Sequence, residues 1–182
     1  MSIKKISSRE VYRNPWTRVR EDVIERSNGV RGIYGVIEKD PACLVIPLDE
    51  TAEGDFVYLV EQFRYTVGQR SLEFPQGGWE RADVDPEELA RGELREETGL
   101  VADSMTRLAT FQIAVGVMAQ EQHTYLARGL KQGETQRDPE ETDMQVFRMP
   151  VAEFEEMLVS NRIVDNCTAA AWGIYRLWRE RQ

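Results

Sequence analysis

The order of strand-like and helix-like segments is the feature that most constrains the fold of this chain. Runs rich in β-branched and aromatic residues, separated by turns, predict strands at 17–23, 33–37, 42–48, 56–65, 108–114, 124–127 and 144–149. Helices are expected only at 86–98, from Pro150 to about Val159, and in a terminal segment capped by Asn166 or Thr168. Because helices and strands do not alternate regularly, the pattern predicts a mixed α/β (α+β) fold, an α/β sandwich with a mixed sheet.

The first 40 residues differ from the rest because their short alternating stretches are broken by repeated turn signals. These signals are Asn14-Pro15, Asn28-Gly29 and Asp40-Pro41. Residues 1–40 are therefore predicted to form an N-terminal antiparallel β extension, and residues 41–182 the main domain. A length of 182 residues allows one domain with such an extension but not two full domains.

Charge and composition argue against several classes of protein. A formal charge of -9 at pH 7 speaks against binding to a nucleic-acid backbone. The sequence contains no apolar run near the ~20 residues that span a bilayer, and its start lacks the apolar stretch of a signal peptide. Two distant cysteines and the single His123 give little support to a disulfide framework or a multi-histidine zinc site. The expectation is a cytoplasmic protein without nucleic-acid or membrane partners.

The helix expected at 86–98 has clear boundary signals. Asp85 is in the position of an N-cap, a proline suits the first turn, and Gly99 supplies the stop. At 100° per residue, one side of the helix is expected to face solvent and to pair Glu87 with Arg91. The residues assigned to this solvent side are Glu87, Glu88, Arg91, Arg95 and Thr98.

The opposite side of this helix combines apolar and acidic residues. Glu93, Glu96 and Glu97 share it with Leu89 and Leu94, and burying an unpaired carboxylate costs on the order of several kcal/mol. One interpretation is a wide solvated face, or pairing with arginines from elsewhere in the fold. The other is a divalent cation, and such hard oxygen ligands favour Mg²⁺ or Mn²⁺ over zinc.

Residues 77–100, GGWERADVDPEELARGELREETGL, resemble the Nudix box, whose pattern is GX5EX7REUXEEXGU with U aliphatic. The register is matched by Glu93, Leu94, Glu96, Glu97, Gly99 and Leu100. Phe74-Pro75 and the double glycine before the box look like the family's strand-to-loop entry. Two positions depart from the pattern: Gly92 replaces its arginine, and Val84, or Asp83 with one inserted residue, replaces its earlier glutamate.

The resemblance implies a Nudix-like α/β/α sandwich with a metal site. By the match, Glu93, Glu96 and Glu97 are the expected ligands of Mg²⁺, with Mn²⁺ as a substitute, and Glu97 is also expected to be catalytic. A backbone carbonyl of Gln76 or Gly77 is the expected additional ligand. The metal would neutralise charge on the diphosphate and orient the attacking water.

The order of the flanking motifs resembles the ADP-ribose pyrophosphatase branch of this family. The motifs are VYRNPWTRVRED, LVEQFRY, LEFPQGG, HTYLARGL and a terminal helical pair. This resemblance implies hydrolysis of ADP-ribose or another nucleotide sugar to a nucleoside monophosphate and a sugar phosphate. It also implies a homodimer, because the extension is usually exchanged between subunits in this branch. The alternatives are a non-catalytic nucleotide-binding or regulatory module, or an enzyme for dinucleoside polyphosphates, dinucleotide cofactors or nucleoside triphosphates.

Four further residues are candidates for the reaction or for substrate binding. Relatives in this branch recruit a glutamate base from a late loop, which here contains Glu141, the preferred candidate, and Glu140. A solvated loop is the other interpretation of this segment. Arg64 is expected either to bind a phosphate or to form a surface pair. Glu73 is expected to bind substrate or to support the loop that follows it.

Overall fold

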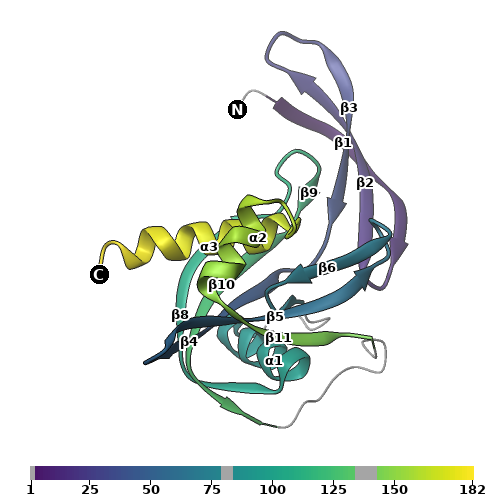
Figure 1. The fold of residues 1–182 in the computed structure, drawn as a ribbon. Coiled ribbons are helices and arrows are strands. Elements are labelled where there is room, and N and C mark those ends of the chain that lie inside the picture. Colours follow the sequence, from purple (N-terminus) through teal and green to yellow (C-terminus); the bar gives the residue numbers. More distant parts are fainter. Residues whose placement is uncertain (1–2, 79–83, 134–142) are drawn as a thin grey trace. The chain divides into compact units, whose positions relative to one another are not determined.

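A computed structural model describes residues 3–78, 84–133 and 143–182, and these divide into two compact units. The smaller unit contains the residues up to Pro41 together with Phe111–Gln122. The larger unit contains Ala42–Thr110 and His123–Gln182. Figure 1 labels the helices and strands of both units.

The smaller unit is a four-stranded sheet in the order β1-β2-β3-β9. Its strands are β1 Ile3–Asn14, β2 Thr17–Arg26, β3 Arg31–Glu38 and β9 Met118–Ala119. The first three pair antiparallel, and β9 pairs parallel to β3. The predicted antiparallel extension is therefore confirmed. The sequence pattern did not predict β1, which lacks a buried face because all its residues except Asn14 are exposed.

The larger unit is built on a seven-stranded sheet with the path β11-β5-β4-β10-β8, in which β6 pairs with β5 and β7 pairs with β4. The strands are β4 Ala42–Thr51, β5 Gly54–Arg64, β6 Gln69–Glu73, β7 Gln76–Gly77, β8 Leu100–Gln112, β10 Glu121–Gln132 and β11 Gln145–Pro150. The centre of the sheet is β4, where seven consecutive residues are buried. Such a continuous apolar run is expected of a strand that is covered on both faces.

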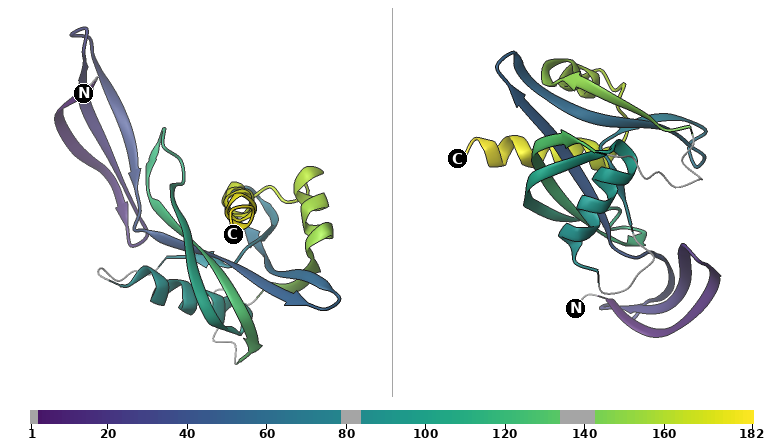
Figure 2. Two further views of the ribbon diagram at one scale, coloured as in Figure 1. Left: turned by 90° about the vertical axis from the view of Figure 1, so that its left-hand side faces the viewer. Right: turned by 90° about the horizontal axis from the view of Figure 1, so that it is seen from below.

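Helices cover the two faces of this sheet, as Figures 1 and 2 show. They are α1 Pro86–Thr98, α2 Val151–Val159 and α3 Asn166–Arg179. On one face, Leu89 and Leu94 of α1 pack with Cys43 and Val45 of β4. The core associated with α2 and α3 is an aromatic cluster of Phe74, Phe154, Trp172 and Tyr175, with successive ring centroids 4.8–5.1 Å apart. The predicted α/β/α arrangement is confirmed.

The helix boundaries follow the capping signals with one correction. The expected span of α1 is confirmed, and Gly99 ends it with φ 74° while its N–H donates to the Arg95 carbonyl at 2.8 Å. Asp85 occupies the N-cap position, although its side chain makes no capping hydrogen bond among the described residues. The predicted cap of α3 at Asn166 or Thr168 is wrong. Asp165 is the cap, because its carboxylate accepts the N–H groups of Cys167 and Thr168. No helix in the described ranges is long and apolar enough to cross a membrane.

Candidate active site

Two of the three predicted acids lie on the inward face of α1. Glu93 is 7% exposed and Glu97 is 2% exposed, whereas Glu96 is partly exposed at the edge of that face. Glu93 and Glu97 are four residues apart, so successive turns of the helix bring them to the same side. The helix thus holds two carboxylates away from bulk water and a third beside them.

The predicted solvent side of α1 is confirmed in part. Glu87 accepts a hydrogen bond of 2.8 Å from Arg91 in a half-exposed i,i+4 pair. Thr98 was predicted on the same side but is buried at 4% exposure. Its hydroxyl donates to the Leu94 carbonyl and accepts the Leu100 N–H at 3.0 Å. The burial follows from the end of the helix, because the chain turns at Gly99 and covers this last position.

Strand β7 brings its backbone to both buried acids of α1. A Cβ atom at Gly77 would lie 2.5 Å from Oε2 of Glu93, so the carboxylate occupies the space that only glycine leaves open. The backbone N–H of Gln76 donates to Oε2 of Glu97 at 3.1 Å. Pairing of Cys43 with Gly77 fixes β7 on β4, against which α1 packs. The predicted residues at the start of the box therefore meet the predicted acids.

Arg64 forms an ion pair with the buried carboxylate of Glu73. Nε of Arg64 donates to Oε1 at 3.0 Å and to Oε2 at 3.2 Å, and Nη2 also donates to Oε2. Glu73 is 3% exposed, and the side chain of Arg64 is 38% exposed. These hydrogen bonds raise the pKa of Arg64, and the negative charges of Glu73, Glu97 and Asp165 add to the effect. Arg64 is thus a permanent cation set among acids.

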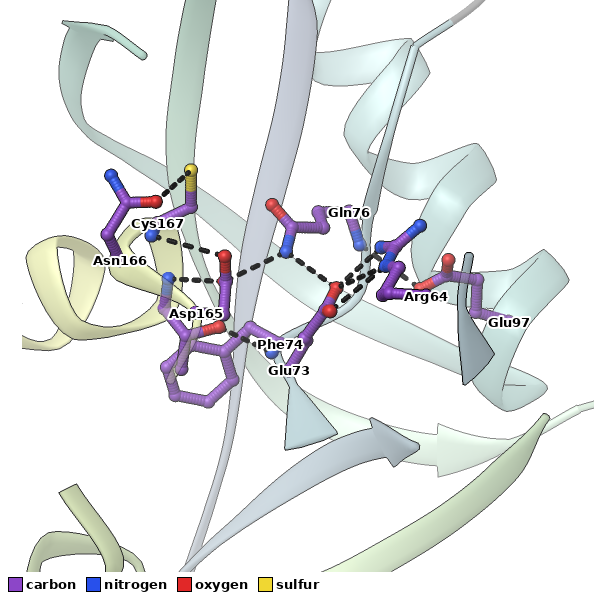
Figure 3. A network of polar contacts seen from close by, with 9 residues as sticks. Arg64, Glu73, Phe74, Gln76, Glu97, Asp165, Asn166 and Cys167 are labelled. Atoms are coloured by element: carbon purple, nitrogen blue, oxygen red, sulfur yellow. Dashed lines mark hydrogen bonds and ion pairs between the residues drawn. The ribbon is translucent and has the colours of Figure 1, made fainter. Parts of the chain in front are cut away.

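Sequence reasoning did not identify Asp165 as a site residue. The side-chain amide of Gln76 donates to Glu73 at 3.0 Å and to Asp165 at 3.0 Å, which joins the first turn of α3 to the Arg64–Glu73 pair (Figure 3). The sequence signal was limited to helix capping around this position. The contact with Gln76, 89 residues away in the chain, is set by the tertiary fold.

The proposed base lies outside the described residues. Glu140 and Glu141 both fall in 134–142.

The chemistry of the acids suits a hard divalent cation. Glu93, Glu96 and Glu97 offer carboxylate oxygens, which bind Mg²⁺ and Mn²⁺ more readily than softer metals. The space at Gly77 is occupied by the Glu93 carboxylate, so the helix and β7 hold one donor group in a defined place. Within the described part of the chain, no three His, Cys, Asp or Glu side chains form a preassembled cluster.

Comparison with known proteins agrees with this fold. Residues 38–166 match the NUDIX domain family, and residues 3–37 match the nucleoside diphosphate sugar hydrolase N-terminal domain family. The chain is 30% identical to the ADP-ribose pyrophosphatase of Mycobacterium tuberculosis, with 91% of this chain and 79% of that protein covered. It is 27% identical to the methanol dehydrogenase activator of Bacillus methanolicus, with 92% and 89% covered. A solved ADP compounds hydrolase superposes with a TM-score of 0.83 at 22% identity, covering 100% of this chain and 96% of that one.

The chain belongs to the Nudix family, because the domain match spans more than half of its length. It is a pyrophosphohydrolase for compounds in which a nucleoside diphosphate is linked to another group. Enzymes of this family generally use a divalent metal ion.

Proposed function

We propose that the protein hydrolyses ADP-ribose or another nucleotide sugar in a Mg²⁺-dependent reaction, releasing a nucleoside monophosphate and a sugar phosphate. Mn²⁺ is the expected substitute for Mg²⁺. The substrate class is supported by the N-terminal match at 3–37 and by relatives named ADP-ribose pyrophosphatase. A small nucleotide-linked molecule is therefore the expected partner, with no role for nucleic acid.

The burial of Glu93 and Glu97 against β7 is the observation that carries this proposal. Glu93, Glu96 and Glu97 would hold the metal, with a backbone carbonyl of Gln76 or Gly77 as an additional ligand. A bound divalent ion supplies charge neutralisation at the phosphoryl oxygens and lowers the pKa of a bound water. The protein's own contribution is to exclude bulk water around these acids, which strengthens every charge interaction there.

Arg64 is proposed to bind a phosphate of the substrate. Glu73 engages Nε and Nη2 of its guanidinium, while Nη1 makes no hydrogen bond to any described residue. A guanidinium fixed on one side by a buried acid presents its remaining donors in a defined direction. Glu73 is proposed to contribute to substrate binding by holding Arg64 in position through this ion pair.

Glu141, with Glu140 as the second candidate, is proposed as the base that takes a proton from the attacking water.

Product analysis over a substrate panel tests the proposed function. The panel contains ADP-ribose, other nucleotide sugars, a dinucleoside polyphosphate, NAD and a nucleoside triphosphate, each with Mg²⁺ and with EDTA. A nucleotide sugar should turn over fastest, and EDTA should reduce the rate by at least about 100-fold. Faster hydrolysis of the triphosphate would refute the substrate class, and full activity in EDTA would refute the metal dependence.

We also propose that the protein is a cytoplasmic homodimer joined through the β extension at residues 1–40. The extension exposes large apolar side chains, among them Tyr12 at 55%, Trp16 at 59% and Ile33 at 67%, and such patches mark association surfaces. Light scattering should give twice the 21.0 kDa chain mass. Ile33→Asp should shift this mass towards the monomer, whereas Val159→Asp, at an apolar position of α2 that is 83% exposed, should not. A wild-type monomer would contradict the proposal.

The cytoplasmic location is supported by the scarcity of cysteine, because the sequence has only Cys43 and Cys167, far apart in the chain. Both side chains are buried. Recovery of the protein from a non-cytoplasmic cell fraction would contradict that location.

A further inference from the structure

We propose that Asp165 is a positioning residue for the phosphate-binding Arg64, acting through the side chain of Gln76 and the carboxylate of Glu73. The inference rests on the proposed function, because it assigns Arg64 to the substrate. Asp165 lies at the start of α3, far in sequence from the Nudix box, and Figure 3 shows its connection to Arg64.

The amide of Gln76 is held in one orientation by two carboxylates. Its nitrogen donates to Oε2 of Glu73 and to Oδ2 of Asp165, each at 3.0 Å. An amide nitrogen has two hydrogens, and this arrangement uses both. Rotating the amide by 180° would turn its oxygen towards two anions, which is unfavourable. Asp165 therefore fixes the donor that in turn fixes Glu73.

Asp165 is itself anchored by the helix that it caps. Its Oδ2 accepts the Thr168 N–H at 2.8 Å, and the Thr168 hydroxyl accepts the Phe74 N–H at 2.9 Å. Thr168 and Phe74 are fully buried. The start of α3 thus holds the segment 73–76 at two points, at Phe74 and at Gln76. This segment is therefore a rigid support for the Arg64–Glu73 pair.

Gln76 also connects this support to the acids of α1. Its side-chain nitrogen donates to Glu73 and Asp165, while its backbone N–H donates to Glu97 at 3.1 Å. A substitution at Asp165 should change the orientation of the Gln76 side chain more than the position of its backbone, because pairing with Leu44 holds that backbone separately. The main consequence should be weaker substrate binding through Arg64, with the Glu97 side of the site less affected.

Two substitutions separate the bridging role of Asp165 from its capping role. Serine caps helices about as well as aspartate, but its shorter side chain cannot reach Gln76 while capping. Asparagine also caps well and retains an oxygen that can accept both hydrogen bonds at the Oδ2 position. A structural role alone predicts the same behaviour for both variants, whereas the positioning role predicts a defect in Asp165→Ser that Asp165→Asn largely rescues.

The test combines steady-state kinetics with NMR of the Arg64 Nε–H and the Gln76 side-chain amide. Asp165→Ser should raise KM about tenfold, as expected for the loss of one hydrogen bond to a charged group. It should change kcat less than about threefold, because binding in the ground and transition states is weakened together. It should also shift both NMR signals. Arg176→Ala, which removes an α3 ion pair with Glu155 away from this network, is the control and should change neither readout.

The outcomes distinguish this inference from the proposed function. If the wild type hydrolyses a nucleotide sugar and Asp165→Ser keeps the wild-type KM and Arg64 signal, the positioning role is overturned while the function stands. If the wild type hydrolyses nothing in the panel, the proposed function fails. The NMR shift then still decides whether Asp165 controls Arg64. Equal defects in the serine and asparagine variants would also overturn the inference.

Discussion

Replacing Glu97 with glutamine is expected to lower kcat by about 1000-fold, the equivalent of about 4 kcal/mol of lost transition-state stabilisation. Glutamine keeps the shape of the side chain and an oxygen that can accept the Gln76 N–H, so the fold should survive. What is lost is the negative charge at a 2% exposed position, where a divalent cation would be bound. Steady-state kinetics with ADP-ribose and a thermal melt measure the two effects separately.

The matched control for this substitution is Glu88→Gln. Glu88 lies on the same helix but is exposed, so Glu88→Gln removes the same charge from the solvent side of α1. Its kcat should remain within about twofold of wild type, since surface substitutions rarely change the structure around them. Equal losses in the two variants would mean that the net charge of α1, and not the buried position of Glu97, matters for catalysis.

Replacing Gly77 with alanine is expected to reduce kcat by about 100-fold, which is the typical effect of displacing a catalytic group by about 1 Å. The new Cβ would lie 2.5 Å from Oε2 of Glu93, so the carboxylate must move. Because the obstructed atoms are the end of a flexible side chain, stability should change by less than about 1 kcal/mol. Kinetics and urea unfolding of the same preparation test both statements.

Gly173→Ala is the control for the glycine substitution. Gly173 lies in α3, where an added Cβ would have no described atom within 4 Å other than its chain neighbours and the helix's own backbone, so alanine there should leave kcat unchanged. Wild-type activity of Gly77→Ala would show that the position of the Glu93 carboxylate is unimportant. A large loss of stability in Gly77→Ala would show that the backbone, and not the carboxylate, absorbs the new methyl group.

The parts of the site that helical periodicity could predict lie on one helix. The period of α1, its proline start and its glycine stop fix which residues share a face, and Glu93 and Glu97 are buried on that face. The misplaced Thr98 shows the limit of periodicity, because the turn at Gly99 brings Leu100 back onto the last residue of the helix.

The parts that sequence could not predict depend on contacts between distant segments. Asp165 and Gln76 meet only because α3 returns to the segment after β6. The capping signal near residue 165 was present, but several polar neighbours carried it equally well, and Asn166 and Thr168 were preferred wrongly. Strand β1 carries many charges and has no buried face, so alternation did not reveal it. Local patterns thus located the acids, while the support around Arg64 required the fold.

The metal site on α1 is tested by a Mn²⁺ titration of the wild-type protein and of Glu97→Gln, in which binding is followed by the loss of the free-ion EPR signal. The wild type should bind Mn²⁺, Mg²⁺ should displace it, and Glu97→Gln should weaken Mn²⁺ binding at least about tenfold. Glu88→Gln should bind as the wild type does. Equal Mn²⁺ affinity of the wild type and Glu97→Gln would contradict the assignment of the buried face of α1 as the metal site.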